Sequence, residues 1–549
     1  MWFYRAVALD LDGTTARDDR VSPDVVAAID DARRDRAVLL VTGRTGAELD
    51  RVFPGLTAHF DAVVTENGAV LAHATGSPGS RPLHEPIDSS VPAALARRGV
   101  RVEHGEVLLA LDGAAAGTAV DVLAGLGLDH QVVHNRGSAM ILPAGVTKAT
   151  GLLAALADLG LSPHNVIAVG DAENDLSLLN TAEVGVAVAD AVPSLIEHAD
   201  VVLVDPDGAG VARLLQGPLV AGHDRVWSTH HLVEVGVRAD GSPLLLPGSQ
   251  ASIVVQGPSG SGKSYLAGLL AERWMDAAYA VLVVDPEGDH RGLASRHDVV
   301  LVDAGTLLPA PHEVLAMLHA GRTSVVLDLS AASLEVRLDY LSRLPVAVAA
   351  ERSRRGVPHW VVNDEAQHSV GLGRSTSFTA GRGDCLVTWR PELLDAGTVD
   401  GADVVVDLDD PGPHGAAEPI HATVTVDGVS ERFTVGRRRS DHVRHQHKYA
   451  VAPLPPERQF YFCRPGSPSV GAATLSEFDD LLGHADADTV AHHASRGDFS
   501  RWVAGTLADP GLAAELTQAE RELVASCARA AEVAREQVQQ AVRKRYLSS

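Results

Sequence analysis

Short apolar runs that end in polar residues recur along the first part of the chain. Residues 6–9, 38–41, 63–64 and 166–169 are each apolar, and a polar or acidic cluster follows each run. Short apolar runs between turn signals are typical of buried strands, and strands that alternate with helical segments predict an α/β sheet. Because open α/β sheets hold their ligands at the carboxyl ends of the strands, the clusters predict a site at that edge.

The cluster after the first run contains two carboxylates, in the sequence Asp10-Leu11-Asp12-Gly13-Thr14. Side chains two residues apart in a strand point to the same side, so Asp10 and Asp12 can converge. A Mg²⁺ ion would relieve their repulsion and bring a phosphate with it. One carboxylate could then attack phosphorus, while the other protonates the leaving oxygen and deprotonates water. The alternative, a strand end with two solvated acids, is disfavoured because this pentapeptide is rare by chance.

Later clusters add further groups that suit phosphate. Thr42-Gly43-Arg44 follows the second run, and residues 65–68 follow the third. Lys148 opens a helix, and residues 170–175 follow the fourth run. Hydroxyls and free amides at strand ends suit phosphate oxygens. The chain has only four lysines, at positions 148, 263, 448 and 544, so Lys148 indicates a need for a compact point charge.

These motifs, in this order, resemble the haloacid dehalogenase (HAD) superfamily and its Cof-type sugar-phosphate phosphatases, over about residues 1–215. The resemblance implies a Rossmann-like core, Asp10 as the nucleophile that forms an aspartyl-phosphate, and Asp12 as the general acid/base. Thr42 and Lys148 would hold the phosphoryl group. The remaining implied residues are the substrate or phosphate contacts Gly43, Arg44, Asn67 and Asn174 and the Mg²⁺ ligands Asp10, Asp12, Asp171 and Asp175.

Residues 69–144 interrupt this core and repeat one pattern twice. The pattern predicts helices over 91–98 and 114–124, and strands over 100–103, 107–111, 131–134 and 139–142. Helix-strand-strand, repeated, resembles the small α/β cap of Cof-type enzymes. A cap that covers the site favours a small substrate, a sugar or polyol phosphate, over a polymer end. The alternative is a structural subdomain without a role in substrate binding.

A second phosphate-binding motif follows a buried strand at 251–256 and precedes a helix at 265–274. In such a P-loop the backbone amides cradle phosphates, the lysine reaches the outer phosphates and the serine holds Mg²⁺. We therefore predict a site for ATP or another nucleoside triphosphate. Its residues are Gly257, Pro258, Ser259, Gly260, Ser261, Gly262, Lys263 and Ser264.

Further apolar strands at 280–284, 324–327 and 360–362 extend this second domain. The last resembles a Walker B strand and ends in Asp364, near Mg²⁺, and Glu365, which would polarise the attacking water. Together with the P-loop, these strands resemble HerA/FtsK-type ATPases over about residues 230–410. Whether the domain hydrolyses ATP or only binds it stays open.

Composition changes again from residue 437. The basic, histidine-rich run at 437–448 is interpreted as a solvated linker rather than a polyanion patch. A mainly helical accessory domain follows, and a capping box from Thr517 to Glu520 predicts a final helix that ends near residue 547. The expected domains are therefore 1–215, 216–436 and 437–549, all but the last of them α/β.

The net charge of −25 argues against a general nucleic-acid or anionic-membrane binder. Three scattered cysteines, the absence of a signal peptide and the absence of a long apolar run predict a cytoplasmic protein. The expected function is a Mg²⁺-dependent phosphatase of a small phosphorylated metabolite, regulated by an ATP-binding domain. Two alternatives stay open: a polynucleotide kinase-phosphatase, and a HerA-like DNA-associated ATPase with an accessory HAD domain. The oligomeric state is also open.

Overall fold

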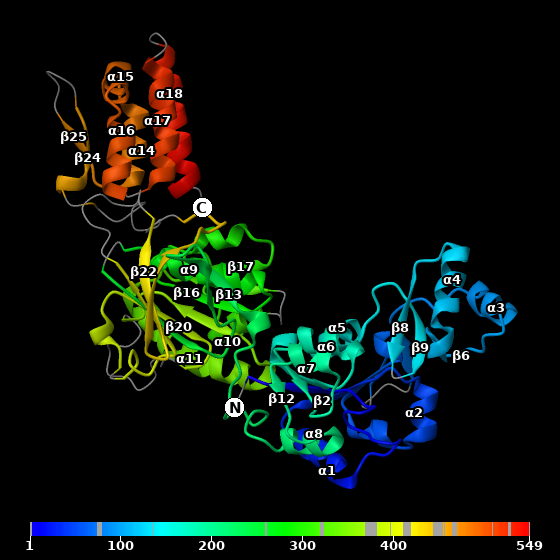
Figure 1. Cartoon of the computed structure of the whole chain (residues 1–549). Coiled ribbons are helices and arrows are strands. Elements are labelled where there is room, and N and C mark those ends of the chain that lie inside the picture. Colours follow the sequence, from blue (N-terminus) through cyan, green and yellow to red (C-terminus); the bar gives the residue numbers. More distant parts are fainter. Residues whose placement is uncertain are drawn as a thin grey trace. The chain divides into compact units, whose positions relative to one another are not determined.

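The computed structural model describes most of the chain. The described residues are 3–73, 79–135, 137–258, 261–318, 323–367, 381–395, 397–409, 419–442, 454, 456–463, 469–507, 509–524 and 529–547. They form two compact units (Figure 1). Unit 1 consists of Met1–Leu232, Pro247–Gln250 and Ala349–His359, and unit 2 of Val233–Leu246, Ala251–Val348 and Trp360–Ser549.

Unit 1 is built on a sheet in the order β12-β11-β10-β1-β2-β3-β4-β5. Neighbours from β12 to β3 pair in parallel, and β4 and β5 add an antiparallel edge. The strands are β1 Ala6–Leu9, β2 Ala37–Val41, β3 Ala62–Thr65, β4 Val70–His73, β5 Ser80–Pro82, β10 Val166–Gly170, β11 Val184–Ala187 and β12 Val201–Val202. The helices are α1 Pro23–Ala32, α2 Gly46–Val52, α5 Lys148–Leu159, α6 Leu176–Thr181, α7 Pro193–His198 and α8 Asp207–Leu215.

The central strands are apolar throughout because both faces of the sheet are covered. Every residue of β1 and β10 is buried, as parallel sheets with helices on both faces require. Side-chain caps fix where helices begin: Ser22 accepts a hydrogen bond from the Val25 amide before α1, and Thr147 accepts one from the Thr150 amide before α5. The cap at Thr147 places Lys148 in the first turn of α5.

The insert between β5 and α5 forms a separate antiparallel sheet in the order β6-β7-β9-β8. Its elements are α3 Ser90–Arg97, β6 Glu103–His104, β7 Leu109–Asp112, α4 Ala116–Leu126, β8 His130–Asn135 and β9 Ser138–Pro143. The two helices pack on one face of this sheet through Val91, Leu95 and Leu123 (Figure 1). The predicted helix-strand-strand repeat is therefore present.

Unit 2 is built on a larger sheet in the order β14-β13-β23-β22-β21-β15-β20-β19-β16-β18-β17. Strands from β21 to β17 pair in parallel, and the other four form an antiparallel extension. The strands are β13 Val233–Arg238, β14 Pro243–Leu246, β15 Ser252–Gln256, β16 Val281–Asp285, β17 Val299–Asp303, β18 Ser324–Asp328, β19 Trp360–Asn363, β20 Asp384–Thr388, β21 Val404–Leu408, β22 His421–Val426 and β23 Val429–Val435. The helices are α9 Lys263–Asp276, α10 Pro311–Ala316 and α11 Leu334–Arg355, whose last turns belong to unit 1.

The end of the chain is mainly helical and has its own apolar core, which includes Phe460, Phe478 and Phe499. Its elements are β24 Phe460–Phe462, β25 Val470–Ala472, α14 Leu475–His484, α15 Ala487–Ser495, α16 Asp498–Trp502, α17 Pro510–Val524 and α18 Arg529–Val542. The predicted fold class, two α/β parts and a mainly helical part, is confirmed. The domain limits 1–215, 216–436 and 437–549 stay a prediction.

The prediction that the final helix begins at Thr517 is wrong. Thr517 lies inside α17, where its hydroxyl donates to the Ala513 carbonyl, and therefore caps no helix. Glu520 instead accepts hydrogen bonds from the backbone amides of Phe499 and Ser500. The sequence pattern of a capping box is short, so it also occurs by chance within helices.

The interpretation of residues 437–448 as a solvated linker is also wrong for the side chain of Arg438, whereas Arg437, Arg439 and Asp441 are exposed. The side chain of Arg438 is 1% exposed and lies against Glu272 of α9, with Nε 3.4 Å from Oε1. Residues 443–448 lie outside the described residues. Within the described ranges, no helix combines the length and apolar character needed to cross a bilayer.

Candidate active site

A lysine between two carboxylates forms the centre of the predicted site in unit 1. Lys148 Nζ donates to Asp10 Oδ1 at 2.5 Å and to Asp175 Oδ1 at 2.6 Å. Asp10 follows β1, Lys148 opens α5, and Asp175 lies in the turn after β10. The fold thus joins three segments, far apart in sequence, at the carboxyl edge of the sheet.

Burial gives these charges unusual proton affinities. All three side chains are at most 5% exposed. Burial raises the pKa of Asp10 well above its usual value, the nearby Asp175 raises it further, and Lys148 opposes both. Burial alone would lower the pKa of Lys148, but the Asp10 and Asp175 carboxylates together raise it. Lys148 therefore stays charged and neutralises part of the negative charge at this edge.

Three carboxylates form a group that could hold a cation. One oxygen each of Asp10, Asp171 and Asp175 lie within 4.8 Å of one another, and all three residues are buried. The Thr14 hydroxyl donates to Asp171 Oδ1 at 3.1 Å, and the backbone amides of Asp171 and Ala172 donate to Asp175 Oδ2 at 3.1 Å. Carboxylate oxygens held in this way are the donors that Mg²⁺ prefers, so the residues fit the expected ion.

Asp12, predicted as a fourth metal ligand, lies outside that group and pairs with Arg44. Arg44 Nε donates to Asp12 Oδ2 at 2.8 Å, and Nη2 donates to Asp12 Oδ1 at 2.6 Å. Nη2 also contacts Asp19 Oδ1 at 2.5 Å. The Asp12 side chain is 31% exposed, which leaves it open to solvent and substrate. The bidentate arginine fixes the orientation of this carboxylate.

The other predicted phosphate contacts lie around the same edge. Thr42 is buried at the end of β2, and its hydroxyl accepts a hydrogen bond from the Arg44 amide at 3.1 Å. Gly43 lies between them in the same turn. Asn174 Nδ2 donates to Asn67 Oδ1 at 3.3 Å, which brings the turn after β10 to the turn after β3. The roles assigned to these residues stay predictions.

Glu66, in the turn after β3, is a further residue of the site region whose role the sequence did not indicate. Its carboxylate accepts hydrogen bonds from the backbone amides of Glu106, Val107 and Leu108, at 2.7, 2.9 and 2.9 Å. These amides belong to the loop between β6 and β7 of the cap. Glu66 therefore ties the cap to the edge that carries Asp10. The polar cluster at 65–68 was visible in the sequence, but nothing marked its partners.

The predicted nucleotide site lies in unit 2, where β15 and β19 end. The Ser264 hydroxyl donates to Asp364, and His290 Nε2 lies 2.9 Å from Asp364 Oδ2. Burial alone would raise the pKa of Asp364, but these hydrogen bonds lower it. Burial, and then the Asp364 charge, raise the pKa of Glu365 to about 7. Lys263 Nζ donates to the Pro258 carbonyl at 2.8 Å.

The rest of the P-loop is described in part. Ser259 and Gly260 lie outside the described residues. Gly257 and Gly262 have φ of 150° and 98°, and Gly262 is in the left-handed region that favours glycine. Ser261 is buried. In the described part of the loop, Gly262 therefore has a backbone conformation that a residue with a side chain would rarely adopt.

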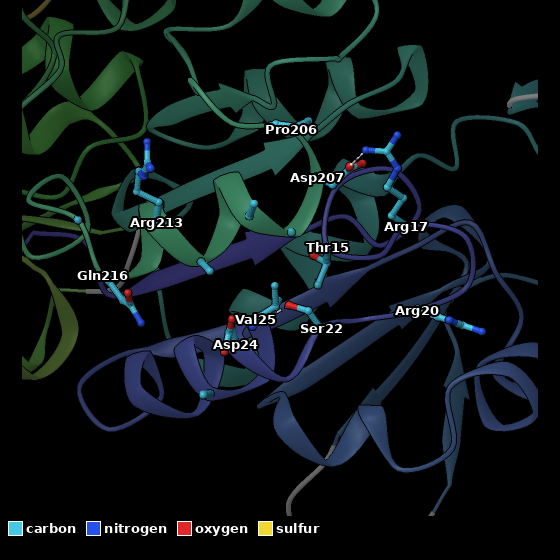
Figure 2. A pocket seen from close by; sticks show the side chains of 15 residues that line it. Thr15, Arg17, Arg20, Ser22, Asp24, Val25, Pro206, Asp207, Arg213 and Gln216 are labelled. Carbon is cyan, nitrogen blue, oxygen red and sulfur yellow. Dashed lines mark hydrogen bonds and ion pairs between the residues drawn. The ribbon is translucent and has the colours of Figure 1, made fainter.

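A cavity of about 940 Å³ lies elsewhere on unit 1, and none of the predicted site residues lines it (Figure 2). It lies between α1 and α8, beside Thr15, whose hydroxyl donates to the Asp10 carbonyl at 2.6 Å. Arg17 Nη1 pairs with Asp207 Oδ2 at 2.7 Å across its rim (Figure 2). The two charges neutralise each other, so this pair leaves no net charge for a ligand.

Comparisons with known proteins assign two parts of the chain to families. Residues 7–85 and 128–215 match the family described as haloacid dehalogenase-like hydrolase. Residues 249–346 match the family described as the central domain of helicase HerA. The resemblances found in the sequence are thereby confirmed.

Similar proteins include two that are named phosphoglycolate phosphatase. Phosphoglycolate phosphatase 2 of Saccharolobus solfataricus is 32% identical over 214 residues, which are 38% of this chain and 90% of that protein. The phosphoglycolate phosphatase of Methanothermobacter thermautotrophicus is 32% identical over 223 residues, 39% of this chain and 97% of that protein. A haloacid dehalogenase-like hydrolase structure from Bacteroides thetaiotaomicron is 20% identical, with a TM-score of 0.34, and covers 39% of this chain and 98% of that one. The chain belongs to the haloacid dehalogenase-like hydrolases and carries in addition a domain of the HerA central type.

Proposed function

We propose that unit 1 hydrolyses a small phosphomonoester through a phosphoryl group carried on Asp10. The observation that supports this most strongly is the contact of Lys148 with both Asp10 and Asp175. Without a ligand, the lysine neutralises the attacking carboxylate. When a phosphate arrives, the same ammonium group can contact its oxygens and leave Asp10 free to attack.

The proposed reaction has two steps. In the first, an Asp10 oxygen forms a bond to phosphorus, the bond from phosphorus to the leaving oxygen breaks, and Asp12 gives that oxygen a proton. In the second, Asp12 takes a proton from water, the water oxygen bonds to phosphorus, and Asp10 is released together with inorganic phosphate. Asp12 must release its contacts with Arg44 to carry a proton, so Arg44 would turn to the substrate during turnover.

Asp10, Asp171 and Asp175 would hold a Mg²⁺ ion, which supplies positive charge to the phosphate oxygens when it is bound. Thr14 orients Asp171, and the amides of Asp171 and Ala172 orient Asp175. These contacts hold the carboxylates in place before substrate arrives. Pre-orientation of this kind lowers the reorganisation that the reaction requires.

We infer that the substrate is small because a cap is attached at the carboxyl ends of the strands, where it can close over the site. Glu66 fixes the β6–β7 loop of the cap to that edge. Sugar and polyol phosphates fit this description, and so does phosphoglycolate, which the names of the relatives suggest. Phosphorylated ends of DNA or RNA fit it less well.

We propose that unit 2 binds Mg²⁺-ATP and regulates the phosphatase. The support for nucleotide binding is the contact of Ser264 with Asp364 at the ends of β15 and β19, together with the match to a HerA central domain. A raised Glu365 pKa, about 7, is suited to a group that accepts a proton from water at neutral pH.

The experiment is a comparison of wild type and Asp10→Asn on a panel of phosphomonoesters with added Mg²⁺. The panel contains sugar phosphates, polyol phosphates, phosphoglycolate, nucleotides and 3′-phosphorylated oligonucleotides. We expect a small phosphomonoester to have the highest kcat/KM and the Asn variant to be inactive. Asp31→Asn, which changes an exposed carboxylate of the same unit, serves as the matched control. An oligonucleotide as the best substrate would replace this proposal with an end-repair function.

A further inference from the structure

A second group of ligating side chains lies in unit 1, at the amino ends of the strands, whereas Asp10 lies at the carboxyl ends. His164 precedes β10, Glu183 precedes β11, and His231 lies in the turn Thr229–His231. One ligand atom from each lies within 4.8 Å of the others. His164 and Glu183 are buried, and His231 is half-buried. Because these residues lie at the amino ends of the parallel strands, the group is separate from the carboxylates of the candidate active site.

Hydrogen bonds orient each member of this group. His164 Nδ1 lies 2.8 Å from Glu183 Oε2, and the Ser249 hydroxyl donates to the other carboxylate oxygen of Glu183. His231 Nε2 lies 2.8 Å from the Ala182 carbonyl, which can only accept. In the neutral ring, Nε2 therefore carries the hydrogen and Nδ1 keeps the lone pair for a ligand. A carbonyl on the far ring nitrogen and a hydroxyl on the carboxylate are the usual partners of metal ligands.

The donor set indicates which ion would bind. Two imidazoles and one carboxylate suit Zn²⁺, which takes three protein ligands and a water in tetrahedral geometry. The Asp10 group offers three carboxylates and suits Mg²⁺ instead. The two groups in unit 1 therefore differ in the metal that they select.

The group also lies where the chain leaves unit 1 and returns to it. His231 lies two residues before the start of β13, and Ser249 lies shortly after the end of β14. We propose that His164, Glu183 and His231 bind a zinc ion that holds these two segments to the loops before β10 and β11. The ion would stabilise unit 1 without taking part in phosphate chemistry.

The test uses the full chain after removal of metal with EDTA. Zn²⁺ and Co²⁺ binding are measured by titration, and the visible absorption of bound Co²⁺ reports imidazole ligands. We expect wild type to bind one equivalent of Zn²⁺ and to gain thermal stability from it. His231→Ala should weaken binding about tenfold or more and lose that gain.

His230→Ala is the matched control, because His230 is the adjacent residue and bonds the His198 carbonyl instead. It should bind Zn²⁺ as wild type does. Glu183→Gln provides a second test that keeps the size of the side chain. Asp10→Asn should also bind as wild type, which excludes zinc at the carboxylate site. Absence of binding in wild type, or equal binding in His231→Ala, would mean a hydrogen-bonded cluster only and would overturn the proposal.

Discussion

At the scale of single residues, Lys148 lies at the centre of the candidate active site, between Asp10 and Asp175. Its side chain is 2% exposed, and its ammonium group contacts two buried carboxylates. Breaking a buried ion pair by removing one partner leaves uncompensated charge, which typically costs about 3–5 kcal/mol. We therefore expect the loss of this lysine to affect both stability and the proposed reaction.

We predict that Lys148→Met abolishes phosphatase activity and lowers the stability of unit 1 by about 3–5 kcal/mol, because Asp10 and Asp175 then face each other without a cation. Activity assays and urea unfolding measure the two effects. Lys544→Met, which replaces a lysine near the end of the chain, is the control and should change neither. A stable, active Lys148→Met variant would contradict the assigned role.

His442 gives a prediction about pH. Burial, and then the Arg438 charge, lower the pKa of His442 to about 3. The native state keeps this histidine neutral, whereas the unfolded state binds a proton near pH 6.5. The contribution of His442 to the free energy of unfolding is therefore complete above pH 6.5. It falls by about 1.4 kcal/mol per pH unit as the pH drops toward 3.

Urea unfolding of wild type and His442→Gln between pH 7 and pH 5 measures this effect. The comparison removes the contribution of other groups that titrate in both proteins. We expect stability to fall less steeply with decreasing pH in the variant. Equal slopes would show that His442 takes up its proton in the native state too.

The residues of the candidate site could be read from the sequence because each belongs to a short motif after an apolar run. Asp10, Lys148 and Asp175 were all found in this way, and the fold joins them. Contacts between residues far apart in the sequence could not be predicted in this way. Nothing local to Glu66 marks the cap amides that it binds, and the 4.8 Å grouping of His164 with Glu183 and His231 depends on the tertiary fold.

At the scale of elements, the segment after β23 packs against α9, the helix that the P-loop opens. Glu272 of α9 accepts hydrogen bonds from the amides of Arg439 and Ser440, at 2.9 and 3.0 Å, and contacts the buried Arg438 side chain. The Arg438 amide donates to the Tyr265 hydroxyl at 2.9 Å. A basic run predicts exposure because charges are usually solvated. The Arg438 side chain is buried instead, because it contacts Glu272, which lies 166 residues earlier in the chain.

We predict that Glu272→Leu and Arg438→Leu each destabilise unit 2 by about 3–5 kcal/mol, because each leaves the other charge buried and unpaired. The double variant should lose less than the sum of the two. A double-mutant cycle in urea, with exposed Glu335→Leu as a control on another helix, measures the coupling. Strict additivity would mean that the two side chains do not stabilise each other.

At the scale of the whole molecule, each unit carries its own proposed phosphate site. Lys148 and the three carboxylates belong to unit 1, whereas Lys263 and Asp364 belong to unit 2. The motifs of both sites, and the α/β class of both units, were predictable from sequence because each motif is contiguous. Strands β22 and β23 of the antiparallel extension were not predicted, since that region carries no recognised motif.

We predict that Lys263→Ala weakens Mg²⁺-ATP binding about ten- to a hundred-fold, because a charge-assisted contact with the outer phosphates is lost. Basal phosphatase activity without nucleotide should stay unchanged, and any effect of ATP on the wild-type rate should disappear. Titration of ATP and rate measurements with and without ATP test this in both proteins. Unchanged ATP affinity would refute the P-loop assignment, and a wild-type rate that saturating ATP leaves untouched would refute regulation.

The central claim is that Asp10 carries the phosphoryl group during turnover. The most direct measurement is acid quenching of the enzyme during turnover of its best small substrate, followed by peptide mass spectrometry. We predict one added phosphoryl group on the peptide that contains Asp10, and none in Asp10→Asn. A phosphoryl group on another residue, or steady turnover by Asp10→Asn, would contradict it.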